Sequence, residues 1–346
     1  MLTERPPLTG AGTDAHLQSK PSSPTRSPFV SFAQNFEDVM LWRALGHIPS
    51  GFYIDIGACE PEAHSVTKAF YDRGWSGINI EPARSPFARL ATARPRDSNL
   101  CLLVSDSEGA RDFFLIGEEN GLSTAVPELA ERHAAAGWSC QAVTVQATTL
   151  AKICDQHVRG QIHFLKIDAE WSELAILRGA DFKRFRPWIV LFEAKAVGDR
   201  PHAYEDCDRV LEQAEYRFLY ADGLNHFWAA EEHYAELAPH FAVPPNVFDG
   251  FVRASEVAAQ AEMSRAEVAA ADAQAQLDRT LAERDTISQE LYETNRFAAA
   301  LTVERQVLLE RVGSLKSHLD AVYASTSWKF AWPVRAARRV LKGGRR

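Results

Sequence analysis

Short apolar runs alternate with segments of helical periodicity between residues 31 and 250, and this alternation limits the possible folds more than any other feature. The runs are rich in β-branched and aromatic residues, which is typical of parallel strands buried on both faces. Their alternation with helices predicts a doubly wound α/β sheet. The expected strands are 52–56, 77–80, 100–104, 143–146, 164–168 and 188–193.

The end of this region has a different pattern. Two more strands are expected at 218–220 and 226–228, and the Asp-Gly-Leu-Asn segment 222–225 between them is typical of a turn. Two short strands joined in this way form an antiparallel hairpin. The predicted fold is therefore a Rossmann-like sheet with a terminal antiparallel hairpin, followed by a long helical region.

Changes in composition set the expected domain boundaries. The first residues are rich in Pro, Ser, Thr and Gly and cannot bury enough apolar surface to offset the entropy of ordering. Pro244, Pro245 and Gly250 close the sheet domain, and no proline follows until Pro333. The expected parts are a disordered arm at 1–28, a sheet domain at 29–250, a helical region at 251–325 and a basic tail at 326–346.

One heptad register fits residues 277–322 of the helical region. Its a positions are Leu277, Arg284, Leu291, Ala298, Arg305, Val312 and Leu319, and its d positions are Thr280, Ile287, Thr294, Leu301, Leu308, Leu315 and Val322. The second half of this seam is clean, which favours a coiled coil, and hence a homo-oligomer through 277–322. The alternative is one long solvated helix that folds back on the domain.

The net charge of −8 and the pI near 5.8 argue against nucleic acid as a partner, because phosphate binding requires clustered Lys and Arg. The tail at 326–346 is the exception, since it contains no acidic residue. Its cations are Lys329, Arg335, Arg338, Arg339, Lys342, Arg345 and Arg346. With Trp328, Phe330 and Trp332 among them, they suit an anionic membrane surface, although a solvated tail is the alternative.

No apolar run reaches the ~20 residues that span a bilayer, and the N-terminus lacks the apolar segment of a signal peptide. The five cysteines are an odd number without C-x-x-C spacing, which indicates reduced thiols. We therefore expect a cytoplasmic protein, which the tail can hold at the inner face of the membrane.

Polar or small residues stand where successive expected strands end, and in a doubly wound sheet these ends form the ligand site. They are Asp55, Gly57 and Ala58, then Glu81, then Ser105 and Asp106, then Asp168. A small residue such as Gly57 lets the backbone approach a ligand closely. Glu81 can accept both ribose hydroxyls of an adenosine, and Asp106 can accept from an adenine amino group.

The glycine pattern narrows the choice of adenosine ligand. After Gly57 no G-x-G-x-x-G spacing follows, which disfavours NAD and FAD and makes a nicotinamide-dependent oxidoreductase an unlikely alternative. S-adenosylmethionine (SAM) has no pyrophosphate and does not need that cluster. The sequence therefore favours SAM as the cofactor.

These segments resemble the FkbM methyltransferase family over about residues 31–250. The resemblance is carried by 53–58 (YIDIGA), 65–67 (SVT), 70–75 (FYDRGW), 77–82 (GINIEP) and 164–168 (FLKID) with Glu170 and Glu173. Segments 121–124 (GLST) and 222–225 resemble the branch found beside bacterial polysaccharide genes. The resemblance implies SAM-dependent methylation of a hydroxyl, on a sugar, a surface glycan or a small molecule.

The resemblance also implies residue roles. Asp55 and Gly57 would line the methionine end of SAM, Glu81 would hold the ribose and Asp106 would face the adenine. Asp168, with Lys166 and Glu170, would face the transferred methyl group and the acceptor. Two positions depart from the family pattern: Cys59 stands where Asn is usual and Trp171 stands where Gly is usual.

A sugar hydroxyl needs a base or a metal to become a good nucleophile. Asp168 is the first candidate for the base, because it ends the strand beside the expected cofactor cleft. The other candidates are Glu170, Glu193, His64 and His226, of which His64 is attractive because imidazole titrates near neutral pH. Its alternative role is that of an exposed residue in a helix that begins at Pro61. No spacing motif requires a metal, although Asp168 and another carboxylate can hold a divalent ion.

A second class of function stays open from the sequence alone. The chain can be a non-catalytic scaffold whose coil recruits partners in polysaccharide assembly and whose sheet domain only binds SAM. The acids at successive strand ends favour the enzyme, whereas Cys59 and Trp171 leave room for the scaffold.

Overall fold

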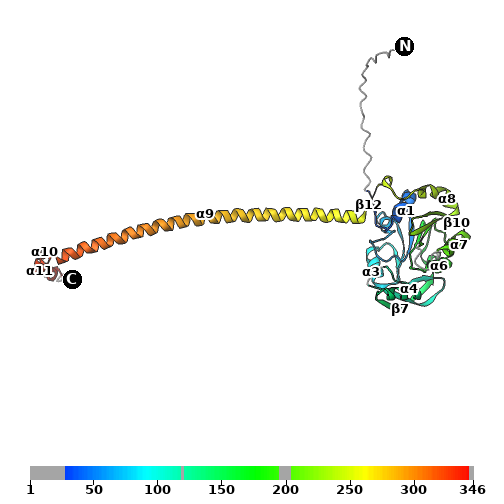
Figure 1. Ribbon diagram of the computed structural model, residues 1–346, viewed down its shortest axis with the longest axis horizontal. Helices are drawn as coiled ribbons and strands as arrows, with labels where there is room; N and C mark the ends of the chain where they lie inside the picture. Colours follow the sequence, from blue (N-terminus) through cyan, green and yellow to red (C-terminus); the bar gives the residue numbers. More distant parts are fainter. Residues whose placement is uncertain (1–27, 118–120, 195–203, 343–346) are drawn as a thin grey trace, which may run out of the picture. The chain divides into compact units, whose positions relative to one another are not determined.

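The computed structural model describes residues 28–117, 121–194 and 204–342, so the arm expected at 1–28 lies almost entirely outside them. Two compact units divide the chain between Ala259 and Gln260. The first contains the strands and most helices, and the second is helical (Figure 1).

The first unit is built on a seven-stranded sheet. Its order is β10 (Tyr216–Ala221), β11 (Asn225–Ala230), β9 (Ile189–Glu193), β8 (Phe164–Ile167), β2 (Phe52–Ile56), β3 (Ser76–Ile80) and β4 (Ser98–Leu100). Neighbours are parallel except that β11 is antiparallel to both β9 and β10. The predicted doubly wound sheet with a terminal antiparallel hairpin is therefore confirmed.

Helices cover both faces of this sheet because buried side chains alternate along each strand. Tyr53, Phe164 and Leu191 pack with one set of helices: α1 (Glu37–Leu45), α2 (Lys68–Asp72), α8 (Glu231–Leu237) and the 3-10 turn Ala238–Phe241. Ile54 and Leu165 pack on the other side, with α5 (Leu150–His157), α6 (Glu173–Arg178) and α7 (Glu205–Gln213). Helix α3 (Arg84–Ala93) connects β3 to β4.

A second, three-stranded sheet corrects the prediction of one strand over 100–104. The main-sheet strand β4 ends at Leu100, and β5 (Leu103–Ser105) pairs in parallel with β7 (Cys140–Thr149) instead. β7 also pairs with β6 (Gly109–Ile116), and α4 (Pro127–Ala135) lies between these two strands in sequence. An apolar run does not specify which strand it pairs with, so the sequence could not separate β4 from β5.

The helix expected from Pro61 is also wrong, because residues before Lys68 form turns. Arg94 is fully buried and donates to Pro61 O at 2.5 Å and to Ser65 Oγ at 3.1 Å. These long-range bonds hold the segment in an irregular path, in which His64 has a φ of 58°.

Short elements close the first unit and lead into the second. β1 (Phe29–Ser31) pairs in parallel with β12 (Phe251–Arg253), which follows a 3-10 turn at Val247–Asp249. Three helices follow: α9 (Ala254–Ala324), α10 (Thr326–Phe330) and α11 (Trp332–Lys342). Within the described residues, no helix combines the length and apolarity needed to cross a bilayer.

Candidate active site

Polar residues end neighbouring strands on the sheet face that α1 and α2 cover. Asp55, Lys166 and Glu193 each lie two residues beyond an apolar residue of that face, so strand alternation directs them to the same side. Pairing in the sheet places Asp55 beside Lys166, and Glu193 beside Asn225 of β11. The carboxyl ends of β2, β8 and β9 and the amino end of the antiparallel strand β11 therefore form one polar edge.

Lys166 is the buried cation of this edge. Its Nζ donates to Gly57 O at 2.9 Å and lies 3.2 Å from Asp55 Oδ1 and 3.5 Å from Asp168 Oδ2. Burial alone would lower the pKa of Lys166, but Asp55 and Asp168 raise it well above its ordinary value. Lys166 thus stays protonated and holds the loop after β2, and it is not a base.

Gly57 brings this loop into close contact with the strand beside it. Its φ is 72°, and a Cβ atom there would lie 1.8 Å from Asp168 O. Both Gly57 N and Ala58 N donate to Ile80 O, at 3.0 and 3.2 Å. No side chain fits at position 57, so the backbone there can be approached closely by a ligand.

Glu81 connects the loops after β2 and β3. It is buried, and its Oε1 accepts from Ala83 N at 2.8 Å while its Oε2 accepts from Cys59 N at 3.1 Å. Burial raises the pKa of Glu81, and the two backbone donors oppose that rise. Each carboxylate oxygen keeps acceptor capacity for a second donor. With the cradle at Gly57, this arrangement fits an adenosyl ligand whose ribose hydroxyls donate to Glu81.

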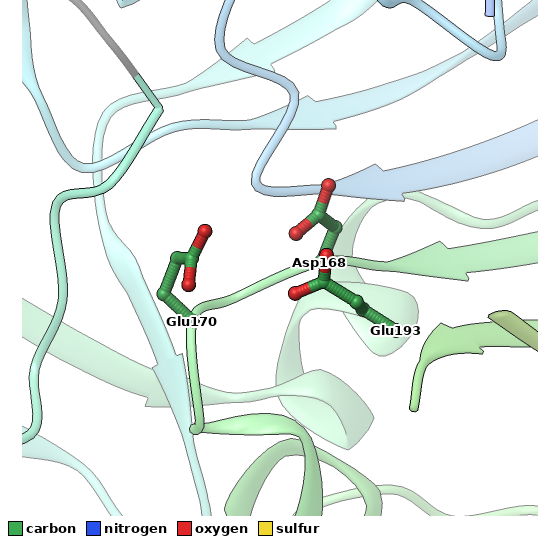
Figure 2. Close-up of side chains that lie close together, drawn as sticks. All are labelled: Asp168, Glu170 and Glu193. Atoms are coloured by element: carbon green, nitrogen blue, oxygen red, sulfur yellow. The ribbon is translucent and has the colours of Figure 1, made fainter. Parts of the chain in front are cut away.

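Three half-buried carboxylates lie at the ends of β8 and β9. One oxygen each of Asp168, Glu170 and Glu193 lies within 4.8 Å of the others, and Figure 2 shows the three side chains around a common space. Such a group can accept several hydrogen bonds from hydroxyls, or it can hold a divalent cation. The sequence marked all three residues separately as candidate bases, and the fold brings them together.

The loop that carries Glu170 has an unusual backbone. Glu170 and Trp171 have φ values of 43° and 78°, and Cys59 in the loop after β2 has 46°. Gly and Asn adopt this left-handed region most easily, so Cys59 and Trp171 are held in a backbone conformation that their side chains disfavour. Thr124 Oγ1 donates to Glu170 O at 2.7 Å, and the Arg132 guanidinium lies 5.4 Å from the Trp171 ring centre. Thr124 and helix α4 therefore contact this loop.

Cys59 is not a nucleophile in this environment. Burial, with a smaller contribution from the Glu81 charge, raises the pKa of its thiol to about 11. The thiol stays neutral at physiological pH. The contribution of Cys59 is its backbone N–H, which donates a hydrogen bond to Glu81 Oε2.

Two predicted histidines lie apart from the carboxylates. His64 is exposed in its turn. His226 follows Asn225 on β11 and so lies on the opposite sheet face, where its Nδ1 is 3.1 Å from Asp208 Oδ1 of α7. Strand alternation thus separates His226 from Glu193, and neither histidine joins the candidate base group.

Ser105 is the last residue of β5 and Asp106 follows it, so both lie at the end of a strand of the small sheet and not of the main one. Asp106 accepts from Ser105 Oγ at 3.4 Å and from Ser107 Oγ at 2.7 Å, and it is exposed. Its contact with adenine stays a prediction.

The structure adds one polar group that the sequence did not indicate. Asn225 Nδ2 donates to Glu37 Oε1 at 2.9 Å and to Asp222 Oδ2 at 3.1 Å. Burial raises the pKa of Glu37 at the start of α1. Asn225 lies beside Glu193, so this cluster borders the carboxylate edge. No local pattern could have predicted it, because Glu37 and Asn225 are 188 residues apart.

Comparison with known proteins finds a similar family. Residues 55–218 match the family model described as the methyltransferase FkbM domain. This part of the chain is therefore similar to that family, and its main sheet has the doubly wound, Rossmann-like fold. The curated proteins include no match to it.

Solved structures with a similar chain path are distant in sequence. A TehB-like SAM-dependent methyltransferase from Corynebacterium glutamicum is 10% identical, with a TM-score of 0.31 over 56% of this chain and 87% of its own. An O-methyltransferase from Bacillus cereus, in complex with SAH, is 10% identical with a TM-score of 0.33, over 58% and 82%. A Methanococcus jannaschii fibrillarin pre-rRNA processing protein is 11% identical with a TM-score of 0.29, over 53% and 67%.

Proposed function

We propose that the sheet domain is a SAM-dependent O-methyltransferase that acts on a hydroxyl of a sugar or glycan. The observation that carries this proposal is the group of three carboxylates, Asp168, Glu170 and Glu193, beside the glycine backbone at position 57. A hydroxyl acceptor needs a base, and a polyhydroxylated acceptor needs several hydrogen-bond acceptors around it. This edge of the sheet offers both.

The cofactor is held by the loops after β2 and β3. When bound, SAM supplies a methyl group already activated on its sulfonium. The backbone at Gly57 and Ala58 admits the ligand closely, and Glu81 accepts from its ribose. Lys166 Nζ donates a hydrogen bond to Gly57 O, which holds this loop in place before any ligand binds.

Asp168 is the base in this proposal. The Asp168 side chain is 41% exposed, so an acceptor molecule can reach it. The ammonium group of Lys166 lies 3.5 Å from its Oδ2 and orients the carboxylate. Asp168 would take the proton of the acceptor hydroxyl, and SAM would supply the methyl group and leave as S-adenosylhomocysteine when its sulfur–methyl bond breaks. Glu170 and Glu193 accept from neighbouring hydroxyls and orient the acceptor.

Calorimetry of SAM with the wild type and with Glu81→Ala tests the cofactor site, with exposed Glu108→Ala as the matched control. We expect micromolar binding that only Glu81→Ala abolishes. If the folded wild type binds no SAM, the proposal of a methyltransferase is wrong and the non-catalytic scaffold becomes the working hypothesis.

Transfer of labelled methyl from SAM to hexose and deoxyhexose methyl glycosides tests the base. Asp168→Asn should retain SAM binding and lose about 100-fold or more in rate, since general-base catalysis typically contributes that much. Exposed Asp112→Asn is the control. An unchanged rate in Asp168→Asn would exclude Asp168 as the base.

The helical tail supports a role at a membrane. In α11, Pro333 and Ala337 fall on one side of the helix by their spacing, and Arg335 and Arg338 fall on the other. The Arg335 guanidinium lies 3.7 Å from the Trp328 ring centre. A helix with this distribution of charge lies on an anionic lipid surface. The tail in our proposal holds the enzyme at the inner face of the membrane that carries its acceptor.

Co-sedimentation with vesicles that contain phosphatidylglycerol tests this role. The full chain should sediment with them and not with neutral vesicles, and a chain that lacks 326–346 should stay in solution. Equal sedimentation of both chains would contradict the proposal.

A further inference from the structure

Helix α9 exposes apolar side chains along its whole length. It spans 71 residues, all of which the structure describes, and none is buried. Leu301, Leu308 and Leu315, at successive d positions, are 47%, 55% and 57% exposed. A helix in water does not retain such a stripe without a partner, because the stripe gains nothing until it is covered.

The spacing of the stripe identifies the kind of partner. Apolar residues recur with the heptad repeat over 277–322, which exceeds the three to four heptads that define a coiled coil. A stripe with a 3.5-residue period stays in contact only with another helix of the same period. The partner is therefore a helix with this repeat, and α9 of a second copy provides one.

The charged residues within the stripe determine the alignment. Arg284 and Arg305 occupy a positions, and Glu283 and Glu304 occupy the preceding g positions. In a parallel pair without offset, each a side chain packs beside the g residue of the facing helix, so each Arg meets a Glu of the partner. An offset of one or two heptads places both arginines against apolar layers.

We propose that residues 277–322 of two copies form a parallel, in-register coiled coil. The arginines destabilise the seam relative to leucine and in exchange select the register, as polar a residues do. One pair opposes this alignment, because Arg311 at g faces Lys316 at e. That pair lies at the solvated margin, where like charges are screened.

The pairing also has a consequence for membrane binding, and this consequence rests on the membrane role proposed above for the tail. A parallel pair holds two basic tails at the same end of the coil. One weak membrane contact is readily reversible, whereas two linked contacts bind much more tightly without any new chemistry.

Cysteine cross-linking of the full-length chain, combined with its solution mass, tests the proposal. Three consecutive alanines provide matched variants, because Ala298 is at a whereas Ala300 is at c. Both Ala298→Cys and Ala300→Cys are made with exposed Cys101 and Cys140 changed to Ser. We expect the solution mass of a dimer for both variants. Mild oxidation should give a disulfide-linked dimer only with Ala298→Cys.

Each other outcome overturns the proposal. A monomer at micromolar concentration removes the coiled coil, and a trimer or tetramer mass removes the two-stranded form. A dimer that Ala298→Cys does not cross-link is antiparallel or out of register. SAM binding, measured on the same samples, reports separately on the sheet domain, so loss of one property is distinguishable from loss of the other.

Discussion

The sheet domain buries an ion pair in its core, whereas helix α9 exposes its charged side chains to solvent. In the domain, Asp55 and Lys166 are buried together, and each is held by specific partners. In α9 the ion pair of Arg284 with Asp285, at 2.6 Å, leaves both side chains about two-thirds exposed. The domain therefore specifies its structure internally, whereas the helix presents a pattern that only another helix can complete.

Removal of one charge of an ion pair should give the largest difference in the free energy of unfolding between the two regions. Lys166→Met leaves Asp55 buried without its cation and removes the donor to Gly57 O. Breaking a buried ion pair from one side costs about 3–5 kcal/mol. The matched change in α9, Asp285→Asn, should cost less than ~0.5 kcal/mol because that pair is solvated. Urea unfolding of both variants measures the difference, and equal costs would contradict the contrast.

A change of pH should affect the domain through Glu173. Burial raises the pKa of Glu173 from 4.5 to about 7, against a bond from Ala169 N. Between those values the folded state keeps a proton that the unfolded state has released, so this contribution to stability is full below pH 4.5 and is lost as pH rises to 7. Glu173→Gln removes it.

The measurement is the free energy of unfolding at several values between pH 4.5 and 7. We expect Glu173→Gln to flatten the decline by up to about 1.4 kcal/mol per pH unit, since one proton is involved. Buried Asp38, whose pKa burial also raises to about 7, keeps part of the slope in the variant. Exposed Glu290→Gln in α9 is the control, and identical slopes in both variants would count against Glu173.

A backbone comparison at Trp171 should give a smaller effect. Trp171→Gly and Trp171→Ala both lose the ring beside Arg132, so their difference reports the φ of 78°. We expect the glycine variant to be more stable by about 1 kcal/mol, because a Cβ is disfavoured in that region. Thermal unfolding of the two variants decides it, and a more stable alanine variant would show that the loop relaxes.

The same exchange should have the opposite sign in α9. Gly313 lies within the helix, and a Cβ there would meet no atom within 4 Å. Gly313→Ala should therefore stabilise the helix by about 0.5–1 kcal/mol and leave the sheet domain unchanged. Helix melting followed by circular dichroism at 222 nm, the usual helix wavelength, measures it. A loss of helix stability would mean that position 313 is a packing site.

Prediction from the sequence succeeded where a local pattern decides the structure. The strands around Asp55, Lys166 and Glu193 were found because apolar runs and their polar ends are contiguous in the chain. The hairpin that ends the sheet followed from the turn residues at 222–225. The separation of β4 from β5 was missed, because it depends on pairing with β7, about 40 residues later in the chain.

The candidate site shows the same limit. Glu81 and Asp168 were recognised as strand-end acids, but not that Glu81 binds the backbone of Cys59 or that Glu170 lies near Glu193. Those contacts arise from strand order, which brings distant segments to one edge of the sheet.

The sequence by itself determined the alternation of strands and helices, the heptad pattern of the long helix and the charge of the tail, because each is a local property of side-chain type and spacing. Only the tertiary structure decided which strands are neighbours, which sheet face each polar residue joins and which backbone positions are left-handed. Pairing and burial are set by the free energy of the whole packed domain, and Arg94, Glu37 and Lys166 acquire their roles only from partners far along the chain.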